Sequence, residues 1–107
     1  MKRKINKRDA AKRAMIEIAD YLANDSILLA ANFIDAVERT LDFLATMPEI
    51  GAHWESDHPH LKDIRVWSVD GFPDHLIFYR PTNEYIDLVF VCHSHRDLNE
   101  LLANLNK

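Results

Sequence analysis

The spacing of apolar positions predicts two helices in the first half of the chain. Apolar side chains recur every three or four positions through residues 11–22 and again through residues 30–44. This spacing matches the 3.6 residues of a helical turn, so each segment has one apolar face. Asn6 is expected to cap the first helix and Ser26 the second, which ends before Pro48. The short connection between the helices predicts an antiparallel helical hairpin.

Further along the chain the apolar spacing changes to a period of about two, which is typical of strands. Residues 64–69 and 75–80 are predicted to pair through the turn-forming residues between them, and residues 85–92 follow as a third strand. The third segment is almost entirely apolar, which indicates a central position in the sheet. A short strand is expected at residues 4–5, and the leucines within 98–105 predict a last helix.

These elements place the chain in the α+β class. Their order, β-α-α-β-β-β-α, predicts an N-terminal helical hairpin packed on a small, mostly antiparallel sheet with a C-terminal helix. The length of 107 residues predicts one domain over residues 1–107. Apolar runs are too short for a membrane span or a secretion signal, so we expect a cytoplasmic protein without membrane contact.

The net charge of −4 conceals a strong asymmetry along the chain. Residues 1–13 hold seven Lys and Arg against one acid, a charge of +6, whereas residues 14–107 hold six bases against sixteen acids, a charge of −10. A basic segment on an acidic body is an argument about partners rather than about fold. It is either a solvated start of the first helix or a contact surface for an acidic partner.

The histidines and the single cysteine raise the question of a metal site. His53, His58 and His60 share a polar loop, whereas Cys92, His93 and His95 follow the third strand. Structural zinc sites favour two clustered ligand pairs, and a cysteine that ends an apolar strand acts as a small hydrophobe. We therefore expect no metal and no other cofactor. Two glycines are too few for a glycine-rich phosphate loop, and no serine lies in a nucleophile elbow, so no catalytic residue is assigned.

Basic and aromatic residues on the predicted strands form the more informative set. Arg65 and Trp67 are two residues apart, so they share one face of their strand. If Arg65 converges with His75 or Arg80 and with Arg96, the three form a positively charged concavity for phosphate or carboxylate. The alternative is that each arginine pairs with a nearby acid at the surface.

The order of elements and six short phrases resemble the RelE/ParE superfamily of bacterial toxin–antitoxin toxins, and its ParE branch in particular. The phrases together span most of the chain and occur in the family's order: residues 18–22 (IADYL), 30–34 (AANFI), 47–51 (MPEIG), 61–67 (LKDIRVW), 77–80 (IFYR) and 93–98 (HSHRDL). The resemblance implies a plasmid-stabilisation type of toxin that causes growth arrest and is neutralised by a cognate antitoxin in a hetero-oligomer.

Two activities occur within this superfamily: inhibition of DNA gyrase by protein binding, and metal-independent, ribosome-dependent cleavage of mRNA. The nuclease requires a basic surface because phosphate neutralisation dominates its affinity for RNA. The acidic body and the absence of a tyrosine after Tyr85 depart from the nuclease pattern. His93 or His95 keeps the nuclease alternative open as a general base. We therefore expect a gyrase inhibitor without direct nucleic-acid binding, with a nuclease or an inactive relative as alternatives.

The resemblance also implies that an amphipathic antitoxin segment lies between the helical hairpin and the sheet, as an added strand or as a helix in a groove. We expect the partner-binding residues to be three arginines that meet antitoxin acids and two aromatic anchors, because Arg, Trp and Tyr dominate interface hot spots. These residues are Arg65, Arg80, Arg96, Trp67 and Tyr79.

Overall fold

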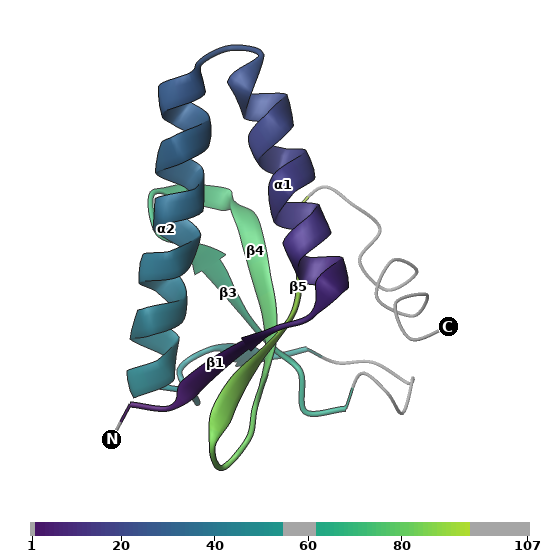
Figure 1. The fold of residues 1–107 in the computed structure, drawn as a ribbon. Coiled ribbons are helices and arrows are strands. Elements are labelled where there is room, and N and C mark those ends of the chain that lie inside the picture. The colour runs from purple at the N-terminus through teal and green to yellow at the C-terminus, as the bar shows by residue number, and fades with distance from the viewer. Residues whose placement is uncertain (1, 55–61, 95–107) are drawn as a thin grey trace.

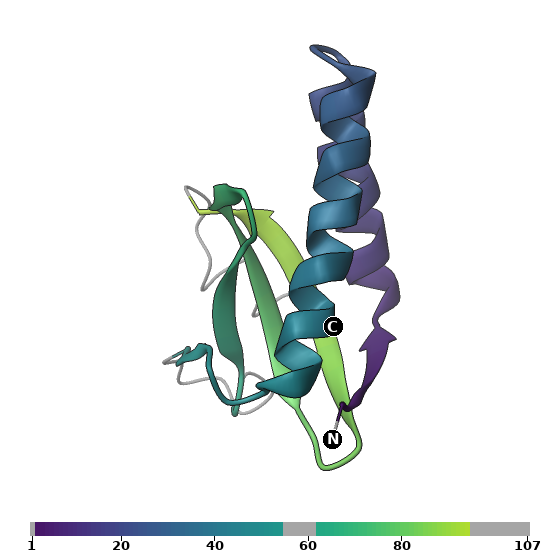
Figure 2. The ribbon, with the colours of Figure 1, turned by 90° about the vertical axis from the view of Figure 1, so that its left-hand side faces the viewer.

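A computed structural model describes residues 2–54 and 62–94 as two layers. A helical hairpin of α1 (Asp9–Ala23) and α2 (Ile27–Thr46) covers one face of a five-stranded sheet. Figures 1 and 2 show that the connection between the helices projects well beyond the strands. The strands that form the sheet are β1 (Lys4–Lys7), β2 (Ala52–His53), β3 (Arg65–Val69), β4 (Phe72–Pro81) and β5 (Tyr85–His93).

The sheet has the strand order β1-β5-β4-β3-β2. β1 pairs with β5 in parallel, and the other neighbours are antiparallel, so the predicted mostly antiparallel sheet is confirmed. β5 lies between β1 and β4 and is largely buried, which confirms the central position predicted from its apolar sequence. In the sequence, the helical hairpin separates β1 from the other strands. In the sheet, β1 nevertheless lies beside β5, the last strand.

The predicted cap of α2 is confirmed, and the predicted cap of α1 is wrong. The Ser26 hydroxyl accepts a hydrogen bond from Leu29 N–H at 3.1 Å. Asn6 instead lies inside β1, opposite Asp87 of β5, and α1 begins after Arg8. The strand pairing extends two residues beyond the predicted 4–5 because each further residue adds backbone hydrogen bonds, which outweigh one side-chain cap.

Other element boundaries also differ from the sequence prediction. β4 begins at Phe72 rather than at residue 75, because Asp70 and Gly71 form a tight turn in which Gly71 has φ +80°. The two-residue strand β2 lies within the segment predicted to be a loop. The predicted C-terminal helix, together with His58, His60, His95 and Arg96, lies outside the described residues.

Apolar clusters lie on both faces of the sheet. The larger one fills the space between the hairpin and the sheet and includes Phe33, Leu41, Leu44, Ile77 and Leu88. The predicted apolar stripe of α2 supplies much of it. A smaller cluster on the opposite face contains Ile64, Phe78, Val89 and Cys92. Within the described residues, neither helix is long and apolar enough to cross a membrane.

Candidate functional site: the Trp67 groove

Tyr79 joins the end of α2 to the sheet and is fully buried. Its hydroxyl donates a hydrogen bond to the Pro48 carbonyl at 2.9 Å and accepts one from Gly51 N–H at 3.0 Å. Burial, opposed in part by the Gly51 hydrogen bond, raises the pKa of the Tyr79 hydroxyl above its usual value. Tyr79 therefore presents no surface to a partner in this structure, and its role is to hold residues 48–51 against the sheet.

Arg65 lies opposite Tyr79 in the β3–β4 pairing and holds the same segment. Its Nη1 atom donates to the carbonyl oxygens of Glu49 and Gly51, each at 2.8 Å. The sequence alternatives for this arginine were an anion-binding concavity or an ion pair with a nearby acid. The described hydrogen bonds are instead to backbone carbonyls, because the chain turns beneath β3 after α2.

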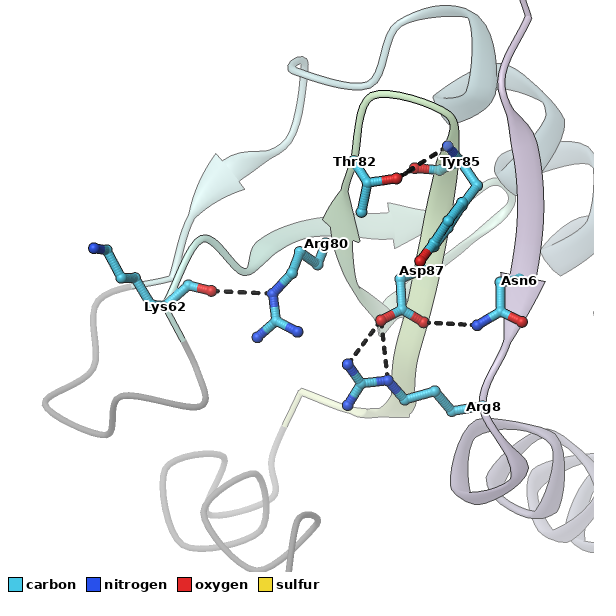
Figure 3. Close-up of polar contacts among 7 residues, drawn as sticks. All are labelled: Asn6, Arg8, Lys62, Arg80, Thr82, Tyr85 and Asp87. Carbon is cyan, nitrogen blue, oxygen red and sulfur yellow. Dashed lines mark hydrogen bonds and ion pairs between the residues drawn. The ribbon is translucent and has the colours of Figure 1, made fainter.

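Arg65 and Arg80 do not converge. Arg80 follows Tyr79 in β4, so its side chain leaves the sheet on the face opposite to that of Tyr79 and Arg65. The Nε atom of Arg80 donates to the Lys62 carbonyl at 3.2 Å (Figure 3). The structure therefore does not bring these two arginines into the predicted concavity, and the position of Arg96 lies outside the described residues.

Trp67 is partly exposed and lies in a shallow groove between α2 and the β3–β4 turn. Its indole is 6.0 Å from the Phe43 ring of α2, measured between centroids. We call this site the Trp67 groove and define it by its lining residues, which are mostly apolar or small: Arg39, Thr40, Phe43, Trp67, Ser68, Val69, Asp70, Gly71 and Pro73.

Thr40 connects the two sides of the Trp67 groove, α2 and the β3–β4 turn. Its buried hydroxyl donates to the Ala36 carbonyl at 2.7 Å and accepts from Asp70 N–H at 3.0 Å. The β3–β4 turn is thereby tied to α2. At the exposed rim, Arg39 Nε and Asp70 Oδ2 are 3.7 Å apart, a separation at which a solvated pair contributes little stability.

The groove adjoins further exposed apolar surface. Phe43 in the last turn of α2 and Met47 at its C-cap are 40% and 49% exposed, and Ile50 is 36% exposed. Phe43 and Met47 were not predicted from the sequence; their four-residue spacing outside the apolar stripe of α2 is the signal that could have found them, although only the fold shows that Trp67 meets Phe43. An exposed apolar surface beside a groove is a candidate interaction site.

The outer edge of β3 is open beside the Trp67 groove. Trp54 N–H donates to the Ile64 carbonyl at 2.9 Å, and β2 then pairs with Arg65 and Val66. Backbone groups alternate in direction along a strand, so Ser68, like Ile64, faces outward. No strand among residues 2–54 and 62–94 pairs with this outer edge at Ser68.

The basic N-terminal segment is largely engaged within the chain. Arg8 donates from Nε and Nη2 to Asp87 Oδ2 at 3.0 and 2.7 Å, and the Asn6 amide donates to Asp87 Oδ1 at 3.1 Å (Figure 3). Asp87 is almost completely buried. The remaining contacts attach the segment to α2 and to the β4–β5 turn: Lys2 with Asp42, Lys7 with Glu38, and Arg3 with the Thr82 carbonyl. These contacts fasten β1 to its neighbours.

His75 and His93 form a small aromatic group at the far end of β4 and β5. Their rings are 5.2 Å apart, and Phe33 is also 5.2 Å from His75. Burial first, and His93 second, lowers the pKa of His75, while Asp74 opposes the shift. Within the described part of the chain, no group of three His, Cys, Asp or Glu side chains is placed to hold a metal ion.

Comparison with known proteins identifies the family. Residues 5–98 match the family model described as the ParE toxin of the type II toxin–antitoxin system, parDE. The chain belongs to the ParE toxin family. Among solved structures, this ParE-family chain is similar to one titled as the chromosomal ParDE toxin–antitoxin system from P. aeruginosa, with a TM-score of 0.67 at 14% identity. The match covers 85% of this chain and 95% of that chain. No curated protein matches the sequence.

Family membership confirms the resemblance drawn from the sequence phrases, and the similar solved structure supports the fold. The protein is a ParE-family toxin of a ParDE toxin–antitoxin system, which implies a cognate antitoxin partner. Of the five residues predicted to bind partners, Trp67 alone lies in an exposed apolar groove within the described residues, whereas Arg65 and Tyr79 support the turn that follows α2.

Proposed function

We propose that the cognate antitoxin neutralises this ParE-family toxin by binding the Trp67 groove, and that the toxin arrests growth by binding DNA gyrase. The observation that carries the first part is the contact between the partly exposed Trp67 and the exposed Phe43 beside an open strand edge. An extended antitoxin segment would pair with the outward backbone groups of Ser68 and place an apolar side chain against Trp67.

The gyrase assignment draws support from charge and from the positions of the basic side chains. Residues 14–107 carry a charge of −10, which opposes binding to ribosomal or messenger RNA. On the described strands, Arg65 and Arg80 leave opposite faces, and each donates to a backbone carbonyl. Such an arrangement does not form the basic cluster that RNA cleavage requires, and it favours inhibition by protein binding.

The proposal that the antitoxin binds the Trp67 groove is tested by measuring the affinity of purified toxin variants for the cognate antitoxin. Trp67→Ala is expected to weaken binding at least about tenfold, because truncating a central aromatic anchor commonly costs more than about 1 kcal/mol. Tyr85→Ala is the matched control, since Tyr85 is an exposed aromatic residue at the opposite end of the sheet. Equal affinities of wild type and Trp67→Ala would remove the groove from the interface.

The target part is tested by inducing the toxin without antitoxin and following growth, plasmid supercoiling and mRNA ends together. A gyrase inhibitor lowers supercoiling and leaves mRNA ends unchanged. Codon-linked mRNA cleavage with normal supercoiling would assign the nuclease activity instead. Unchanged growth with folded protein present would assign an inactive relative.

A further inference from the structure

The tip of the helical hairpin carries exposed apolar side chains that the fold does not use. We define the tip as residues 16–28, which include the loop that projects beyond the sheet in Figures 1 and 2. Four large apolar side chains are mostly exposed there: Ile16 (58%), Tyr21 (73%), Ile27 (80%) and Leu28 (70%). Among the described residues, the other exposed large apolar side chains lie at the Trp67 groove and its surroundings or at Tyr85.

Neither helix capping nor the helix dipole explains why Ile27 and Leu28 are apolar. Ile27 and Leu28 occupy the first turn of α2, where acidic side chains interact favourably with the helix dipole, yet that turn contains none. Ser26 already supplies the cap, and the buried face of α2 begins at Ala30. Polar residues at 27 and 28 would therefore leave the helix and the core intact.

The charge around the loop end of the tip, beyond Ile16, is negative, whereas the exposed Lys12 and Arg13 lie one helical turn before Ile16 on α1. The sequence contains no Lys, Arg or His between Arg13 and Arg39. In that interval Glu17, Asp20, Asp25 and Asp35 are all exposed, and Glu38 is paired with Lys7. At Tyr21, Ile27 and Leu28 the tip is thus an apolar surface bordered by acids. A complementary partner presents apolar side chains bordered by Lys and Arg.

We propose that the hairpin tip is the surface with which the toxin binds its cellular target, and that the target contributes a basic, apolar protein surface. This inference rests on the proposed function, in which the target is DNA gyrase. An enzyme that handles DNA carries basic surface where it contacts phosphates. Like charge opposes nucleic acid, an anionic membrane and a second copy of this chain as occupants. The chemistry of the tip therefore fits a basic protein surface.

The tip is separate from the Trp67 groove. Leu28 near the start of α2 and Arg39 at the groove rim are eleven residues apart, which corresponds to about 16 Å along a helix. Substitutions at the tip consequently leave the groove unchanged. This separation allows target binding and antitoxin binding to be measured independently.

The experiment compares the full-length wild type with two tip variants and one control. The apolar variant is Ile27→Ser/Leu28→Gln, and the charge variant is Glu17→Gln/Asp20→Asn/Asp25→Asn. The control, Asp74→Asn/Glu84→Gln, removes two exposed acids on the sheet side of the molecule. Growth arrest and plasmid supercoiling without antitoxin, antitoxin affinity, molecular mass in solution and melting temperature are measured for each.

Both tip variants are expected to require about tenfold more toxin for the same growth arrest, whereas the control behaves as the wild type. Antitoxin affinity is expected to stay within about twofold and the melting temperature within about 2 °C. Wild-type toxicity in both tip variants would overturn the inference. So would an equal loss of antitoxin affinity, which would assign the tip to the antitoxin, or a wild-type dimer that the tip variants dissociate.

The same measurements separate this inference from the gyrase proposal. If the wild type arrests growth without lowering supercoiling, gyrase is the wrong target, while the growth of the tip variants still decides the role of the tip. If supercoiling falls equally for the wild type and the tip variants, gyrase is supported and the tip inference is overturned.

Discussion

The Tyr79 hydroxyl accepts a hydrogen bond from Gly51 N–H, and a Cβ atom placed on Gly51 would lie 2.5 Å from the same oxygen. Position 51 therefore requires glycine because the Tyr79 hydroxyl leaves no room for a Cβ atom, and not because the backbone needs a positive φ. Together with the Tyr79–Pro48 hydrogen bond, this contact sets the path of the chain after α2. That path places Arg65 against the Glu49 and Gly51 carbonyls, close to the Trp67 groove.

Tyr79→Phe is expected to lower the free energy of unfolding by about 1–3 kcal/mol, because Gly51 N–H loses its buried acceptor. Gly51→Ala is expected to cost more, since the added methyl group displaces the Tyr79 ring and breaks both hydrogen bonds. Urea denaturation of both variants measures the difference. If Gly51→Ala is no less stable than Tyr79→Phe, the contact with the Tyr79 hydroxyl does not restrict position 51 to glycine.

Asp87→Ala is expected to destabilise the protein by about 3 kcal/mol, because it leaves the partly buried Arg8 without its carboxylate and removes the acceptor of Asn6. Lys2→Ala provides the comparison. The Lys2–Asp42 pair is more than half exposed, and such pairs contribute about 0–1 kcal/mol. Chemical denaturation measures both values, and similar small losses for the two variants would contradict the structural role of the Asp87 cluster.

Stability is expected to decrease as the pH falls below about 6.5, because the pKa of His75 is lowered in the folded state. Protons then bind the unfolded chain more tightly than the folded one, so the stabilising effect of neutral His75 is present above the unfolded pKa. It is lost as the pH falls through the lower, folded pKa. Melting temperatures between pH 7.5 and 5.5 measure the effect, and His75→Asn is expected to flatten the profile in this interval.

Ser68→Pro tests whether the antitoxin adds a strand to the open edge of β3. Proline is tolerated where a strand N–H faces outward from the sheet edge, so the variant is expected to fold. Antitoxin affinity is expected to fall about tenfold, because proline removes the donor that an added strand would use. Calorimetric titration measures the affinity, and Ser68→Ala, which keeps the N–H, is the control. Equal affinities of Ser68→Pro and Ser68→Ala would exclude pairing at this position.

Several features were predictable because they depend on neighbours in the sequence. The hairpin follows from an apolar period of 3.6 and from the Ser26 cap, which acts within three residues. The central position of β5 follows from its nearly unbroken apolar sequence, since a strand covered on both faces has no polar side. The family resemblance likewise rests on short local phrases, and the match over residues 5–98 confirms it.

Other features depended on contacts between distant residues. Asn6 and Arg8 are about eighty positions from Asp87, and no local pattern indicates that β1 pairs in parallel with β5. Arg65 and Arg80 were grouped by charge, but strand alternation and the β3–β4 register direct them to opposite faces. Tyr79 was chosen as an aromatic anchor, although the chain after α2 covers it.

The amino-acid sequence by itself determined the helical hairpin, the central strand and the family, because these depend on periodicity and local phrases. Only the tertiary structure decided which side chains remain exposed, because exposure depends on what packs against each face. It combined Trp67 with Phe43 into one groove, engaged Arg65 and Tyr79 in holding the turn after α2, and left the acidic, apolar hairpin tip uncovered.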